Sequence, residues 1–209
     1  MMAQDVGPVP GSRATIGFTS ALFFASGFAA LLYQIAWQRM LFSWYGVDLD
    51  SVSVIVSIFM LGLGAGAIAG GWLADRFQQH RIFIFSLVEL TIGVFGFFSL
   101  EIIGEIGALF AAVSIPRLIA LTFVILIIPT AAMGATLPLL VTELVARTKN
   151  VGQSTGRLYF INTLGAACGS FAAAYILLRF GGLDGVVALA ASLNFTVSVL
   201  AFLMFRTSA

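Results

Sequence analysis

Long apolar runs constrain the fold of this chain more than any other feature of its sequence. Six of them reach the roughly 20 residues that a helix needs to cross the hydrocarbon core of a bilayer. Only 9% of the 209 residues are charged, so water cannot be the solvent for most of the chain. We expect an all-α polytopic membrane protein with spans near 15–37, 52–73, 82–100, 117–142, 157–178 and 185–205.

The segments outside these spans are short. Residues 1–14 are polar and contain Pro and Gly, which predicts a flexible tail ahead of a six-helix transmembrane domain over 15–206. The stretch from Glu101 to Arg117 mixes two glutamates with apolar residues, a pattern typical of a short interfacial helix.

Basic residues predict the orientation of the chain. With six spans, the two tails and the second and fourth loops share a side. That side then holds seven of the ten Lys and Arg residues, namely Arg13, Arg76, Arg81, Arg147, Lys149, Arg157 and Arg206. Because basic loops tend to remain in the cytoplasm, we expect a multi-pass protein of the inner (cell) membrane with both termini cytoplasmic.

Charge and cysteine content exclude several classes of function. A net charge of +1 gives no bulk field to recruit nucleic acid. One cysteine, Cys168, and one histidine, His80, allow neither an internal disulfide nor a Cys/His metal site. The glycine-rich run 62–66 lies inside an apolar span and is no nucleotide loop. We therefore expect no metal and no cofactor, and the lipid bilayer as the first partner.

Small residues recur every four positions on two of the spans. They are Gly62, Gly66 and Gly70 in the second span, and Gly165, Gly169 and Ala173 in the fifth. Such stripes let two helix backbones approach closely, and helix packing alone would explain them. Because the two spans run in opposite directions, they also indicate a 3+3 inverted repeat that resembles one half of a major facilitator bundle.

A carboxylate inside the third span is the least expected residue of the sequence. Glu89 lies about 10 Å from the nearer membrane edge, at 1.5 Å per residue. Carboxylates at such depth usually face a cavity or a partner. Thr136, Tyr159 and Asn162 have a similar depth, so we expect them to line, with Glu89, a site for a proton or a small cation. The alternative is a structural hydrogen-bonded knot around a protonated Glu89.

A second polar group marks the far end of the first span. It contains Tyr33, Gln34, Trp37, Gln38 and Arg39. Of these, Tyr33 and Gln34 are further candidate ligand-binding residues. An interfacial aromatic belt and a snorkelling arginine would explain the same residues without a ligand.

Two further features suggest moving or cavity-lining parts. Pro129 and Pro138 in the fourth span predict a kinked or broken helix, which lines a cavity in many transporters but also serves plain packing.

Asp75 and Arg76 close the second span and Arg81 opens the third, so these three residues are candidates for a latch between helices. Ordinary interfacial charge is the alternative.

Several strings of the sequence, taken together, resemble the N-terminal membrane domain of spermidine synthase-like membrane proteins. They are 26–34 with Trp37 and Arg39, 61–64, 71–76, 88–90, 129–130, 133–138 (MGATLP), 156–159 (GRLY) and 162–165 (NTLG). The segment LADR at 73–76 is also similar to the loop signature of major facilitator transporters. Gln34 stands where the family usually has a glutamate.

The resemblance implies a link to polyamines. In that family a soluble aminopropyltransferase-like domain, which binds an S-adenosylmethionine-type cofactor and a polyamine, follows the bundle. This chain stops at Ala209, so we expect no catalysis by the chain alone.

Two functions of different class follow from these patterns. The first is a bundle that binds or transports a small cationic solute such as a polyamine, as a homo-oligomer or beside other membrane subunits. The second is a non-catalytic accessory or scaffold subunit of a larger membrane complex. A separate soluble enzyme docking on the basic face is a further possible partner.

Overall fold

The structure is a computed structural model that describes residues 12–45, 48–109 and 115–208. Every secondary-structure element in these ranges is helical, as the sequence predicts for a membrane bundle. The long helices are α1 (Ser12–Tyr45), α2 (Asp48–Arg76), α3 (Arg81–Leu109), α4 (Ile115–Thr148), α5 (Val151–Ala172) and α6 (Leu178–Ser208). A short 3₁₀ turn η1 (Gln78–His80) joins α2 to α3, and a π-helical segment η2 (Ala173–Leu177) joins α5 to α6.

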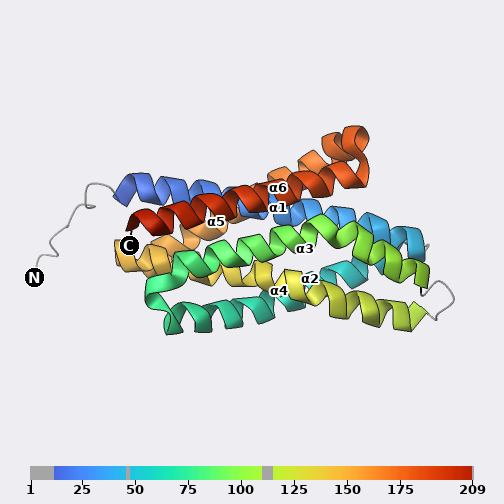
Figure 1. Ribbon diagram of the computed structural model, residues 1–209, viewed down its shortest axis with the longest axis horizontal. Coiled ribbons are helices and arrows are strands. Elements are labelled where there is room, and N and C mark those ends of the chain that lie inside the picture. Colours follow the sequence, from blue (N-terminus) through green and yellow to red (C-terminus); the bar gives the residue numbers. More distant parts are fainter. Residues whose placement is uncertain (1–11, 46–47, 110–114, 209) are drawn as a thin grey trace, which may run out of the picture.

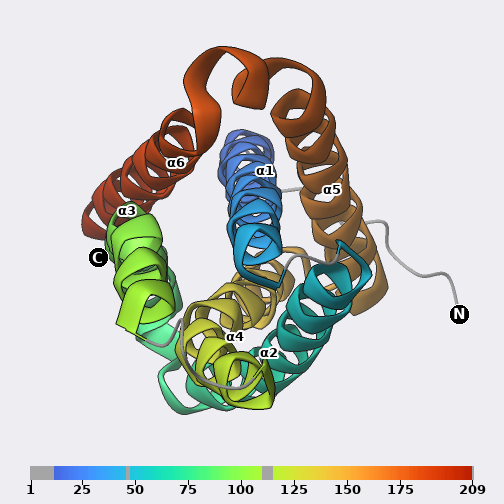
Figure 2. The same cartoon turned by 90° about the vertical axis from the view of Figure 1, so that its right-hand side faces the viewer.

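The helices lie side by side along one axis (Figure 1). α1 begins and α6 ends at the same end of the bundle, which we call the termini end; α1 joins α2, and α3 joins α4, at the opposite end. Seen along the axis, α1 occupies the centre and the other five helices surround it (Figure 2). Leu32, Ala36 and Trp37 of α1 accordingly have no exposed surface.

Five helical stretches among the described residues are long and apolar enough to cross a membrane. They are Thr15–Ser43, Val52–Arg76, Gln78–Ala108, Ile119–Thr148 and Val151–Arg206. The last stretch has 56 residues and contains α5, η2 and α6. It turns back on itself (Figure 2). Gly182 within it has a φ of 59° and a ψ of −164°, which are not helical dihedral angles. The sequence predicts six spans and the structure has five such stretches, because residues 151–206 form one helical stretch apart from the break at Gly182.

Three expectations about single elements need correction. α1 begins at Ser12, inside the stretch expected to be a tail, while residues 1–11 lie outside the described residues. Of the stretch Glu101–Arg117 expected as an interfacial helix, Glu101–Leu109 continues α3, the last three residues begin α4, and residues 110–114 lie outside the described residues. α4 runs unbroken through Pro129 and Pro138, so of the two expected forms, a kinked or a broken helix, the broken one is not present.

The glycine stripes lie where two pairs of helices come closest. A Cβ added at Gly66 would meet the backbone carbonyl of Ala131, and one at Gly70 would lie 2.6 Å from the Cα of Ala135. These glycines, with Gly62 against Thr130, bring α2 onto α4. In the same way Gly165 and Gly169 of α5 lie against the carbonyls of Phe24 and Phe28 of α1. The close approach leaves no room for a side chain at these positions.

Candidate functional site

Glu89 lies on α3 and has no exposed surface. Its Oε1 accepts a hydrogen bond of 2.6 Å from the Ser26 hydroxyl of α1, and its Oε2 accepts one of 2.6 Å from the Asn194 amide of α6. Three helices therefore meet at one carboxylate. Burying a carboxylate costs several kcal/mol, and two short bonds to its oxygens offset part of that cost.

Glycines bring the donors of Glu89 within reach. Gly93 is one turn beyond Glu89 on α3, and a Cβ there would lie 3.3 Å from the Cβ of Asn194 and 3.0 Å from the ring of Phe195. α6 can therefore pack directly on this face of α3. Gly27, next to Ser26, lies in the same way against the backbone and side chain of Asn162 of α5.

A second buried pair ties α3 to α6 one turn nearer the termini end. The Ser86 hydroxyl donates to the Ser198 carbonyl, and the Ser198 hydroxyl donates to the Ser86 carbonyl, both at 2.8 Å. Each serine thus satisfies the backbone of the other helix. This reciprocal pair fixes the register in which Glu89 meets Asn194.

Tyr33 and Trp37 are enclosed in the bundle and form no interfacial belt. Both are fully buried, and their rings stack with centroids 5.3 Å apart. The Trp37 indole N–H donates to the Ser99 hydroxyl of α3 at 2.9 Å. The Tyr33 hydroxyl lies against Gly96 and has no hydrogen-bond partner among the described residues. Gln34, the neighbouring candidate, is only half-buried.

None of the other residues proposed to surround Glu89 donates a hydrogen bond to it in the described part of the chain. Tyr159 is 62% exposed on α5. The Thr136 hydroxyl is buried and donates to the Met133 carbonyl of its own helix at 2.7 Å. Asn162 is half-buried beside Gly27. The hydrogen bonds of Glu89 come from Ser26 and Asn194 instead, and a ligand-binding role for Thr136, Tyr159 and Asn162 stays a prediction.

Arg81 is the latch candidate that joins helices. Its guanidinium Nε donates to the Ala74 carbonyl of α2 at 2.9 Å, and Nη1 to the Thr142 carbonyl of α4 at 3.5 Å. Asp75 and Arg76 are exposed and form no ion pair in the described part of the chain. Arg81 therefore bridges three helices through backbone carbonyls.

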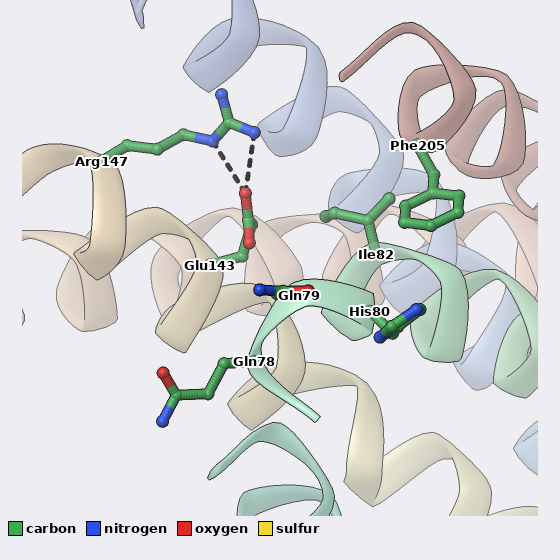
Figure 3. Close-up of a pocket in the computed structure, with 7 residues that line it drawn as sticks. All are labelled: Gln78, Gln79, His80, Ile82, Glu143, Arg147 and Phe205. Atoms are coloured by element: carbon green, nitrogen blue, oxygen red, sulfur yellow. Dashed lines mark hydrogen bonds and ion pairs between the residues drawn. The ribbon is translucent and has the colours of Figure 1, made fainter. Parts of the chain in front are cut away.

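A pocket of about 460 Å³ opens at the α2–α3 turn at the termini end. Figure 3 shows Gln78, Gln79 and His80 of the α2–α3 turn on one side of it. Across from them, Glu143 and Arg147 of α4 form an ion pair at 2.8 Å. Ile82 and Phe205 complete the lining. No three His, Cys, Asp or Glu side chains gather as metal ligands anywhere in the described ranges.

Comparison with known families agrees with a helical membrane bundle. The sequence model of the Major Facilitator Superfamily matches residues 18–209. The chain belongs to this superfamily. As a Major Facilitator Superfamily chain it is a transporter-like bundle, and Glu89 is a buried carboxylate within that bundle.

Several curated proteins are similar to part of this chain. The polyamine aminopropyltransferases of two Mycobacterium tuberculosis strains, CDC 1551 / Oshkosh and ATCC 25618 / H37Rv, and of Mycobacterium bovis are each 30% identical to it over 176 residues. The match covers 78% of this chain and 32% of each relative, so the chain spans about a third of their length. No solved structure matches the chain. The match to these relatives confirms the resemblance to spermidine synthase-like membrane proteins seen in the sequence strings.

Two partners of Glu89 escape sequence reasoning based on depth. Ser26 belongs to one of the strings that carry the family resemblance, but a serine in a span is too common to stand out. Asn194 is the one carboxamide of its predicted span. That amide was the available signal, since a lone amide in an apolar helix needs a partner.

Proposed function

We propose that this superfamily chain binds or transports a small cationic solute such as a polyamine, with Glu89 as the anionic group of the site. The observation that supports it most is the burial of a carboxylate between α1, α3 and α6. A carboxylate kept in an apolar core against its desolvation cost usually has a functional reason. The similarity to polyamine aminopropyltransferases favours a polyamine.

The helix arrangement supports a 3+3 inverted repeat. α2 packs on α4 as α5 packs on α1, and α3 packs on α6. The residues through which α1 contacts α5 have the same spacing along the chain as the residues through which α4 contacts α2. The residues of α2 and of α5 at these two contacts also share one spacing. The equivalent sets are Phe24, Gly27 and Phe28 with Ala131, Gly134 and Ala135, and Leu63, Gly66 and Gly70 with Asn162, Gly165 and Gly169. We infer that the stretch Val151–Arg206 crosses the membrane twice, which gives six crossings.

This repeat bears on function because inverted repeats underlie alternating access in many transporters. We infer further that the termini end faces the cytoplasm, because it carries most of the basic residues. Arg81 would then hold α2, α3 and α4 together at the cytoplasmic end.

Ligand stabilisation tests the proposal. In nanodiscs of neutral lipid, spermidine should raise the unfolding temperature of the wild-type chain, because a ligand at about 100 times its Kd adds about 2.7 kcal/mol. The substitution Glu89→Gln should abolish the shift. Glu101→Gln is the matched control, because Glu101 is an exposed carboxylate of the same helix. A shift that survives in Glu89→Gln would contradict the proposal.

The second candidate function is an accessory subunit of a membrane complex. It is favoured by the large aromatic side chains that α5 leaves exposed, including Tyr159, Phe160 and Phe171 at 62–64%. Partner helices could cover this face, as could lipid. Purification in mild detergent separates the two functions: a stoichiometric complex with other membrane proteins favours the accessory subunit, and a lone chain or homo-oligomer favours the solute site.

A further inference from the structure

Two buried polar atoms near Glu89 lack a hydrogen-bond partner among the described residues. They are Oδ1 of Asn194 and the hydroxyl of Tyr33. Asn194 is 1% exposed and Tyr33 is fully buried. Buried polar groups are almost always satisfied, by protein or by ordered water. Two such atoms beside a buried carboxylate therefore point to a polar site that the side chains alone do not complete.

The two residues that carry these atoms pack on one short stretch of α3. Glu89, Gly93, Gly96 and Ser99 are spaced by three or four residues and so share a face of the helix. Asn194 packs against Gly93, and the Tyr33 hydroxyl lies against Gly96. At 1.5 Å per residue these two glycines are about 4.5 Å apart along the axis. Asn194 and the Tyr33 hydroxyl thus lie against neighbouring glycines on one face of α3, where that face carries no side chain.

Polar groups continue from this stretch in both directions. Toward the termini end, Asn194 bonds to Glu89, and the Ser86–Ser198 pair follows one turn beyond. Toward the opposite end, the Tyr33 ring stacks on Trp37, whose indole donates to Ser99. The row on α3 from Ser86 to Ser99 covers about 20 Å, a large part of a bilayer core about 30 Å thick.

We propose that Glu89 exchanges a proton with the end of the bundle opposite the termini, through water held between Asn194 Oδ1 and the Tyr33 hydroxyl. The proton leaves the Glu89 carboxyl for this water. The Tyr33 hydroxyl accepts a proton from the water and releases its own to a second water on the side of the opposite end, so that one proton moves and the tyrosine is unchanged. Asn194 holds the water but carries no proton. The path uses the carboxylate of the proposed solute site, yet it requires no solute.

The surroundings of Glu89 leave few other routes for a proton. Tyr33 is the ionisable side chain that α1 presents to it. α4 has no ionisable residue between Arg117 and Glu143, and α6 has none between Asp184 and Arg206. A proton that reaches Glu89 from the opposite end must therefore pass by hydroxyls, amides and water.

Infrared spectroscopy of the purified chain in lipid tests this path without any solute. The C=O stretch of the protonated Glu89 carboxyl is assigned by its absence in Glu89→Gln and shifts when deuterium replaces the proton. After transfer to heavy water, Tyr33→Phe should slow this shift about ten-fold or more, which corresponds to a barrier about 1.4 kcal/mol higher. Tyr175→Phe is the matched control, because Tyr175 is 69% exposed, and it should exchange at the wild-type rate.

The possible outcomes separate the path from the solute site. Exchange in Tyr33→Phe at the wild-type rate, with its unfolding temperature unchanged, would overturn the path. The lack of any protonated-carboxyl band in the wild type across about pH 5 to 9 would overturn it too. Neither result bears on spermidine stabilisation, which tests the solute site by itself.

Discussion

Glu89 receives one hydrogen bond from each of two neighbouring helices, so the contribution of each donor can be removed separately. Ser26 bonds to one carboxylate oxygen and Asn194 to the other. Loss of a donor leaves a buried carboxylate oxygen without its partner, which costs more than the net value of the bond itself. The stability of the bundle should therefore be sensitive to small changes at this point.

Ser26→Ala should lower the free energy of unfolding by about 1–3 kcal/mol, because it leaves Oε1 of Glu89 unpaired. Denaturation in detergent, followed by circular dichroism, measures this loss. Ser192→Ala is the control: its hydroxyl donates to the Ala188 carbonyl on an exposed face of α6, so the change should stay within about 0.5 kcal/mol. Equal losses in the two variants would contradict a stabilising role for the Ser26–Glu89 bond.

At the residue scale, the sequence could predict the unusual buried carboxylate Glu89 but not the residues that contact it. Glu89 stands out because the rest of residues 82–100 carries no charge. Depth in the membrane also predicted Thr136 as a partner, but depth does not fix the direction of a side chain. Thr136 instead bonds within its own helix. Which helix meets Glu89 is decided by the Gly93 contact with α6, and that is a property of packing.

At the scale of helices, glycines decide which backbones touch. Gly66 lies against the Ala131 carbonyl of α4, whereas Gly64, two residues earlier on the same helix, has nothing within 4 Å of the Cβ position. The sequence spacing identified the packed stripe through Gly62, Gly66 and Gly70. It could not tell that α4 is the helix packed on that stripe.

The pair Gly66→Ala and Gly64→Ala tests this contact. The methyl group at position 66 must push α2 away from α4 and should cost about 1–3 kcal/mol. At position 64 the methyl group meets open space, so the change should be neutral or stabilising by up to about 1 kcal/mol. Unfolding measurements that rank the two variants in the opposite order would show that α2 and α4 do not pack as described.

The turn near the start of α6 depends on Gly182. Its φ of 59° with ψ of −164° lies in a region that is essentially restricted to glycine. Gly182→Ala should therefore destabilise the chain by about 1–3 kcal/mol. Gly181→Ala, at a neighbouring position that also has nothing within 4 Å, serves as the control in the same unfolding assay. A loss no larger than that of the control would argue against this turn.

At the scale of the whole molecule, apolar runs were enough to predict a helical membrane bundle. The number of crossings is harder to predict, because the turn at Gly182 interrupts an otherwise helical stretch of 56 residues. A helix of that length would measure about 84 Å at 1.5 Å per residue, far more than a bilayer. The stretch must therefore fold back, and the membrane position of its turn is open to direct measurement.

Cysteine labelling tests the proposed six crossings. In a Cys168→Ser background, single cysteines at Gln153, Gly181 and Arg206 report on the start of α5, the turn and the end of α6. A membrane-impermeant maleimide should label Gln153→Cys and Arg206→Cys from one side and Gly181→Cys from the other. Labelling of all three from the same side would contradict the double crossing and the inverted repeat.

The central claim is that the buried carboxylate of Glu89 serves a cationic solute. Its most direct test is uptake of radiolabelled spermidine by lipid vesicles that contain the purified chain, with Glu101→Gln as the control for general loss of charge. We predict uptake by the wild type and by Glu101→Gln, and a loss of about ten-fold or more in Glu89→Gln, a change worth about 1.4 kcal/mol. Uptake by Glu89→Gln at the wild-type rate would contradict the claim, as would wild-type vesicles that take up no more spermidine than empty ones.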